Sequence, residues 1–142
     1  MKEASEIAQA MEFINDKPEG FKTEISQGGT NVSGGQKQRI SIARALVKNP
    51  SILILDDSLS AVDTATEEEI LENIKGVLRN RTGIIISHRV STVKHADEIL
   101  FMDKGRIVER GTHSDLMSLQ GSYYTLFRTQ MNQETDTDEV AI

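Results

Sequence analysis

An apolar run that ends in two carboxylates constrains the fold of this chain more than any other sequence feature. Residues 52–55 are four consecutive aliphatic residues, and Asp56 and Asp57 follow them directly. Such a run is typical of a strand that is buried on both faces, and we expect the strand to span residues 52–56. A second apolar run, residues 84–86, follows a stretch with helical periodicity. Apolar strands that alternate with helices predict an α/β layer with a parallel sheet.

A Ser-Gly-Gly turn precedes the first of these strands. Residues 31–39 read Asn-Val-Ser-Gly-Gly-Gln-Lys-Gln-Arg, and an apolar stretch follows them up to Pro50. We expect a buried helix that begins at Ser33 or Gly34, because serine is a good N-cap. The first turn of a helix has unpaired amide N–H groups, and paired glycines let a phosphate come close to the backbone. The segment therefore predicts either a phosphate site or a plain serine cap.

Composition excludes several classes of protein. The 142 residues carry a formal net charge of −6, which gives no electrostatic footprint for nucleic acid or for an anionic membrane. The chain has no cysteine, so disulfides and thiolate chemistry are excluded. Its apolar runs fall far short of the roughly 18 residues that a membrane-spanning helix needs. We expect one soluble, cytosolic piece.

The rest of the pattern predicts further helices and one hairpin. The first fifteen residues predict an amphipathic helix, and residues 21–32 a loop. A helix capped by Asp63 or Thr64 and a short helix through Val93 come next, and then strands 98–103 and 106–111 around Lys104-Gly105. A helix from Thr112 and a last helix around Tyr123–Gln130 end the pattern. Two strands and a hairpin would leave apolar edges unpaired, so the predicted sheet is incomplete.

The Ser-Gly-Gly segment, residues 31–39, and the apolar run that ends in Asp56-Asp57 form two motifs. In their order and spacing they resemble the signature and Walker B motifs of ATP-binding cassette (ABC) ATPases of the exporter type. The usual wording is Leu-Ser-Gly-Gly-Gln, then four apolar residues, Asp and Glu. Ser60-Ala-Val-Asp63 resembles the D-loop of that family, and His88 follows the second strand where the family has its switch histidine.

The resemblance covers roughly residues 1–131 and implies the C-terminal part of a P-loop NTPase domain, without the P-loop strand and helix. By that resemblance residues 1–48 are a portion of the helical subdomain with the signature helix. Residues 49–131 are the C-terminal part of the RecA-like catalytic core. The acidic stretch 132–142 is expected to be a disordered tail.

The resemblance also implies a role for each matching residue. The cofactors would be ATP and Mg²⁺, with Asp57 and His88 as catalytic residues and Asp56 holding Mg²⁺ through water. The nucleotide would be contacted by Ser33, Gly34, Gly35, Gln36 and Asp63.

Two departures from the family pattern bear on activity. Asp57 stands where the family has its catalytic glutamate, and it is shorter by one C–C bond, about 1.5 Å. In the family this change marks the degenerate, slow site of heterodimeric exporters. The sequence also has no Gly-x-x-x-x-Gly-Lys-Ser/Thr phosphate loop. We therefore expect negligible ATP hydrolysis by the chain alone.

The implied partners are a second ABC ATPase domain and the membrane domain of an exporter. The two ATPase domains would form a homodimer or, as the change at Asp57 favours, a heterodimer. No nucleic acid is expected. The implied location is the cytoplasmic side of the cell membrane, where the full transporter would couple ATP hydrolysis to transport. The segment Thr23–Gly29 resembles the loop that contacts the membrane domain in exporters, and a solvated loop is the alternative.

Plainer explanations stay open for the same residues. The Asp56–Asp57 pair can simply end a strand, Asp63 can simply cap a helix, and His88 can be an ordinary surface histidine. His95 and His113 are expected at the surface.

Two alternative functions also remain. One is the C-terminal lobe of a chromosome-maintenance-type ATPase, which the acidic charge and the absence of heptads disfavour. The other is a non-catalytic interaction lobe that completes a partner's nucleotide site through its signature motif.

Overall fold

The computed structural model of the chain describes residues 1–26 and 28–139, with side chains up to residue 133. It divides into two compact units, Met1–Ser87 and His88–Ile142. This division follows packing, and the boundary at residue 48 that the resemblance implies stays a prediction.

The first unit is built on a parallel pair of strands. β1 (Ile52–Asp56) pairs with β2 (Thr82–Ile86), and the register sets Ile54 opposite Ile84 and Asp56 opposite Ile86. The helix α4 (Thr64–Leu78) connects the two strands, as a parallel crossover requires. The predicted α/β fold with a parallel sheet is confirmed, and the first strand has the predicted bounds.

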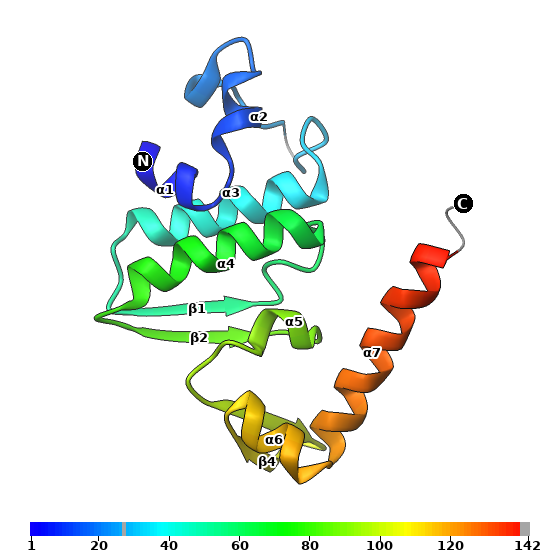
Figure 1. Cartoon of the computed structure of the whole chain (residues 1–142). Coiled ribbons are helices and arrows are strands. Elements are labelled where there is room, and N and C mark those ends of the chain that lie inside the picture. The colour runs from blue at the N-terminus through cyan, green and yellow to red at the C-terminus, as the bar shows by residue number, and fades with distance from the viewer. Residues whose placement is uncertain (27, 140–142) are drawn as a thin grey trace. The chain divides into compact units, whose positions relative to one another are not determined.

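Helices cover one face of this sheet. The helix α3 (Gly34–Val47) lies beside α4, and both pack over β1 and β2 (Figure 1). Leucines of β1 and isoleucines of the two helices form the core between them: Leu53, Leu55, Ile42, Ile70 and Ile74. Contrary to the sequence expectation, α3 is not buried all round, because Val47 is 48% exposed.

The other face of the sheet is apolar and uncovered among the described residues. Alternate residues of a strand point to opposite faces, so the residues between the core leucines lie together there. They are Ile52, Ile54, Ile84 and Ile86, which are 44–58% exposed. The strand buried on both faces that the sequence predicts is therefore wrong for the described residues, because only the leucine face of β1 is covered by helices.

The single N-terminal helix expected from the sequence is wrong. The structure has α1 (Lys2–Ile7) and α2 (Met11–Asn15), separated by Gln9 at φ 52°. The backbone N–H of Gln9 donates to Glu6 O at 3.0 Å and that of Ala10 to Ser5 O at 2.7 Å, which is a Schellman end. The physical reason is tertiary, because Arg39 Nη1 of α3 donates to Gln9 O at 2.7 Å.

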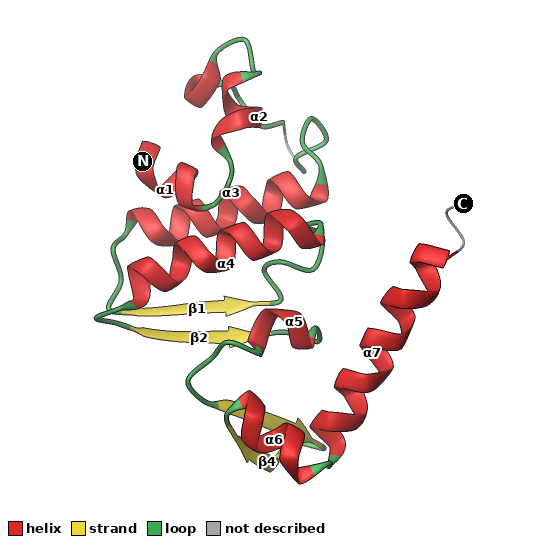
Figure 2. Ribbon diagram, viewed as in Figure 1, coloured by secondary structure: helices red, strands yellow, loops and turns green. Residues whose placement is uncertain are grey.

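A short 3₁₀ turn, Gly20–Lys22, follows α2, and the described residues between this turn and α3 form no further helix or strand (Figure 2). Asn31 organises this loop: its Nδ2 donates to Glu24 O at 3.0 Å, and its Oδ1 accepts from Ser26 N at 3.2 Å. The loop expected from the sequence is therefore confirmed, apart from the 3₁₀ turn.

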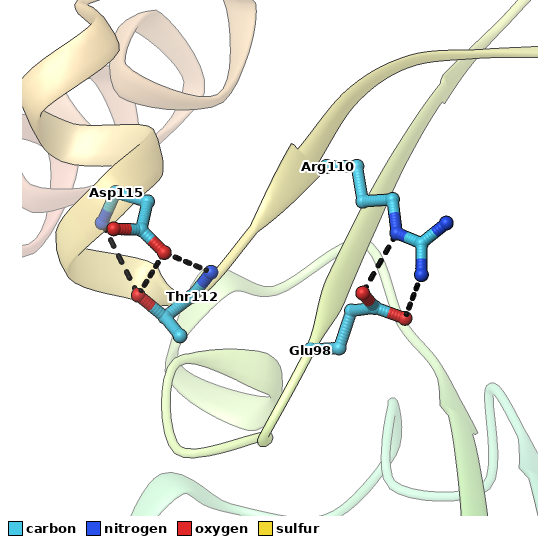
Figure 3. A network of polar contacts seen from close by, with 4 residues as sticks. All are labelled: Glu98, Arg110, Thr112 and Asp115. Atoms are coloured by element: carbon cyan, nitrogen blue, oxygen red, sulfur yellow. Dashed lines mark hydrogen bonds and ion pairs between the residues drawn. The ribbon is translucent and has the colours of Figure 1, made fainter.

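The second unit contains the predicted hairpin. After α5 (Val90–Val93), β3 (Ile99–Asp103) pairs antiparallel with β4 (Arg106–Gly111). Lys104 and Gly105 connect the strands at φ 46° and 75°, the positive angles of a type I′ turn. Arg110 of β4 forms a two-point ion pair with Glu98, the residue before β3, at 2.7 and 3.2 Å (Figure 3).

Two helices complete the second unit. α6 (His113–Leu119) begins with a capping box in which Thr112 Oγ1 accepts from Asp115 N at 3.2 Å and Asp115 Oδ2 accepts from Thr112 N at 3.0 Å (Figure 3). Hydrogen bonds from the side chain and the backbone of Thr112 hold the pKa of Asp115 below its usual value. α7 (Ser122–Glu139) follows.

Two expectations for this unit differ from the structure. α7 continues to Glu139, whereas the sequence predicts disorder from residue 132. The stretch contains no proline or glycine to end the helix, and residues 140–142 lie outside the described part. His113 is half-buried rather than at the surface, because its Nδ1 lies 2.8 Å from the hydroxyl of Tyr123, which is 1% exposed.

Candidate functional site

The Ser-Gly-Gly turn, residues 33–36, forms the N-terminus of α3. Ser33 is the N-cap: its Oγ accepts from Gln36 N at 3.2 Å, and its own N–H donates to Gln36 Oε1 at 3.0 Å. This reciprocal capping box leaves the hydroxyl proton of Ser33 able to donate elsewhere. The predicted helix start is confirmed. The 14-residue helix directs its positive dipole end at this turn.

The glycines of this turn lie against a second turn. Residues 57–61, here called the Asp turn, connect β1 to the segment before α4. A Cβ added at Gly35 would lie 2.8 Å from Ala61 O, which real Cβ atoms essentially never do. A Cβ added at Gly34 would meet only the methyl group of Ala61, at 3.5 Å. Gly35 is therefore required by close backbone approach, and Gly34 is not.

The two carboxylates stand at the carboxyl end of β1. Asp56 is the last residue of the strand, and its side chain is exposed. Asp57 has φ 47°, a left-handed conformation that aspartate tolerates better than most residues. Its backbone N–H donates to Ile86 O at 3.0 Å, which continues the parallel ladder by one bond.

The side chain of Gln38 joins α3 to the Asp turn. Its Nε2 donates to Asp57 O at 3.2 Å and to Ser60 Oγ at 2.9 Å, and its Oε1 accepts from Ala61 N at 2.8 Å. Sequence reasoning did not select Gln38. The only signal was its place in the Gln-Lys-Gln-Arg stretch that follows the glycines.

Asp63 is the N-cap of α4, which decides between the two caps that the sequence allowed. Its carboxylate accepts from Thr66 N at 3.0 Å. Hydrogen bonds from Thr66 hold the pKa of Asp63 below its usual value. The carboxylate is therefore charged at neutral pH, next to the positive end of the helix.

His88 is in the second unit by sequence, whereas residues 33–36 and the Asp turn are in the first. Its side chain is exposed. The amide of Gln130 in α7 holds its backbone, since Nε2 donates to His88 O at 2.7 Å and Oε1 accepts from Val90 N at 2.9 Å. Like Gln38, Gln130 holds a loop through its side-chain amide and was not indicated by the sequence.

The described residues contain no group of three or more His, Cys, Asp or Glu side chains arranged to hold a metal ion. Mg²⁺ needs no such cage, because it commonly binds through one or two carboxylates, phosphate oxygens and water. Asp56, exposed at a strand end, fits that kind of binding. Among the described helices, none is long and apolar enough to cross a membrane.

The glycine pair provides a matched test of the close approach. We expect Gly35→Ala to lower the free energy of unfolding by about 1–3 kcal/mol, because either the helix or the Asp turn has to shift. Gly34→Ala should change it by less than about 0.5 kcal/mol. Urea unfolding of both variants measures the difference. Equal stabilities would contradict the proposed packing of α3 on Ala61.

Several known proteins are similar to this chain in sequence. A family model described as "ABC transporter" matches residues 2–60. An uncharacterized ABC transporter ATP-binding protein of Bacillus subtilis, YknU, is 53% identical over 128 residues, which are 90% of this chain and 22% of that protein. An ATP-dependent lipid A-core flippase of Shewanella frigidimarina is 48% identical over 130 residues, 92% of this chain and 22% of the flippase.

A solved structure gives the same result for the fold. A bacterial Atm1-family ABC exporter with ATP bound matches with a TM-score of 0.85 and 45% identity, over 89% of this chain and 22% of the exporter chain. The chain thus spans about a fifth of the length of the relatives that it matches. With its parallel α/β fold, the chain belongs to the family of ABC transporter ATP-binding domains, and the solved structure that it matches is an ABC exporter.

Proposed function

We propose that the chain is the part of an ABC exporter's ATPase domain that completes the nucleotide site of a second ATPase domain. The capped Ser-Gly-Gly turn carries the proposal. Ser33 and the two glycines stand at the positive end of a long helix, and their backbone is held against the Asp turn. Unpaired amide groups and a hydroxyl donor at such an end suit a γ-phosphate.

The carboxyl ends of β1 and β2 would serve the chain's own nucleotide site. Asp56 would hold Mg²⁺ through water, and Asp57 would orient the water that attacks the γ-phosphate of ATP. His88 would donate a hydrogen bond to that phosphate, as an imidazole can near neutral pH. When bound, Mg²⁺ supplies neutralisation of the phosphate charge.

Asp57 would make the chain's own nucleotide site slow. Aspartate has about the same basicity as glutamate but reaches about 1.5 Å less far. A displacement of that size can cost on the order of 100-fold in rate. We therefore propose a heterodimer in which the partner's site, completed by Ser33 of this chain, is the faster one.

The chain alone should bind Mg-ATP weakly, because it contains no phosphate loop. The capped Ser-Gly-Gly turn also fits a second candidate function, a lobe without turnover of its own that engages an intact ATPase. The two candidates share the same use of the Ser-Gly-Gly turn. They differ in whether Asp57 contributes to any reaction.

The segment Thr23–Gly29 is the proposed contact with a membrane domain. Phe21 and Ile25 in this region are 46% and 51% exposed, and apolar side chains of this kind suit a protein partner. The full exporter would then couple ATP hydrolysis to transport across the membrane, with this domain on the cytoplasmic side.

A charge placed in the Ser-Gly-Gly turn tests the proposed function. An intact exporter ATPase domain with a disabled signature serine is mixed with this chain, and ATP turnover is measured. The wild-type chain should raise turnover. Ser33→Asp should reduce that stimulation at least about tenfold, because aspartate still caps the helix but repels the phosphate.

The matched control is Ser41→Asp, which adds the same charge at an exposed position of the same helix. It should keep the stimulation within about twofold. If the Ser33 and Ser41 variants stimulate equally, the Ser-Gly-Gly turn does not contact the nucleotide. Robust ATPase activity of the purified chain by itself would contradict the proposed dependence on a partner.

The slow site has its own test. In the heterodimeric exporter proposed to carry this sequence, Asp57→Glu should raise the turnover of the nucleotide site to which Asp57 belongs, by about 10- to 100-fold. Asp57→Asn, which cannot act as a base, should give no rise. Unchanged turnover in the Glu variant would sink the proposal of a degenerate site.

A further inference from the structure

The side chain of Gln38 makes more long-range polar contacts than its position on a half-exposed helix requires. It binds three groups of the Asp turn: Asp57 O, Ser60 Oγ and Ala61 N, at 3.2, 2.9 and 2.8 Å. These groups lie 19 to 23 residues further along the chain. One amide therefore fixes α3 to the whole of this turn.

The contacts act on a backbone that needs support. Asp57 has φ 47°, and a left-handed residue persists where its surroundings determine it. Its carbonyl accepts from Gln38 Nε2 and also from Ser60 Oγ at 3.1 Å. Gln38 thus holds both the carbonyl of Asp57 and the hydroxyl that supports it.

Ala61 is held to α3 from two sides. Its N–H donates to Gln38 Oε1 at 2.8 Å, and its carbonyl lies against Gly35, where a Cβ would be 2.8 Å away. The backbone of the Asp turn therefore cannot move without Gly35 and Gln38. These residues lie in the first two turns of the helix whose N-terminus is the Ser-Gly-Gly turn.

The residue type matters for this arrangement. An amide offers donors and an acceptor at once, and both kinds of group are used here. A glutamate side chain keeps the acceptor for Ala61 N and loses the donors. A leucine of similar size keeps neither.

We propose that Gln38 is a positioning residue that couples the Ser-Gly-Gly turn to Asp57. The proposal rests on the proposed function, in which these two groups serve two different nucleotides. Gln38 contacts neither nucleotide and acts through the backbone of the Asp turn. A shift of α3 at the partner's nucleotide is thereby transmitted to the carboxylate of Asp57, which serves the chain's own nucleotide.

Amide hydrogen exchange of the 142-residue chain, measured by NMR, tests the contact itself. In Gln38→Leu the exchange of Ala61 N–H should be about five- to tenfold faster, because its acceptor is gone. In Gln38→Glu it should stay within about twofold of the wild-type rate. Arg44→Leu, at an exposed position of the same helix, is the matched control and should leave Ala61 unchanged. An unchanged rate in Gln38→Leu would overturn the proposal.

Turnover in the mixed assay with the intact ATPase domain tests the positioning role. Both Gln38 variants should lower kcat about tenfold and leave the KM for ATP within twofold, because they move groups without removing a nucleotide contact. Thermal melting verifies that the variants are folded. If the wild-type chain stimulates turnover and Gln38→Leu gives the same kcat, the positioning role is contradicted. A variant that changes only the KM for ATP contradicts it as well. No stimulation by the wild-type chain contradicts the proposed function instead.

Discussion

The close approach of Gly35 to the carbonyl of Ala61 is the constraint on which the arrangement of the first unit depends. It allows the N-terminus of α3 to lie directly against the turn that follows β1. Any side chain at residue 35 would force the two apart, and the three hydrogen bonds of Gln38 would then be lost with them. The same helix shares a hydrophobic core with Leu53 and Leu55 of β1, which also holds it near the Asp turn.

Two glutamines hold the loops that matter for the proposed chemistry. Gln38 fixes the Asp turn in the first unit, and Gln130 fixes the backbone of His88 and Val90 in the second. An amide suits both places, because each loop presents one backbone carbonyl and one backbone N–H. These bonds hold the backbone that carries Asp57 and His88, the side chains proposed for the chemistry, although both side chains are exposed.

Local signals predicted most of the fold. β1 was predicted to the residue because Pro50 and the two aspartates bound it, and the hairpin followed from Lys104-Gly105. The site residues Ser33 and Asp63 were predicted as helix caps, and both are. What the sequence could not provide were contacts between distant residues. The break at Gln9 depends on Arg39, and the role of Gln130 depends on a loop 42 residues away.

The proposed function requires that the Ser-Gly-Gly turn faces a nucleotide held by another ATPase domain. The most direct measurement is paramagnetic broadening of amide NMR signals in the ¹⁵N-labelled chain, bound to an intact ABC ATPase domain that carries ATP with Mn²⁺ in place of Mg²⁺. We expect the signals of Gly34, Gly35 and Gln36 to broaden strongly, and those at the far end of α3 near Val47 to stay sharp. Sharp signals for residues 34–36 in a complex that demonstrably forms would contradict the proposed function.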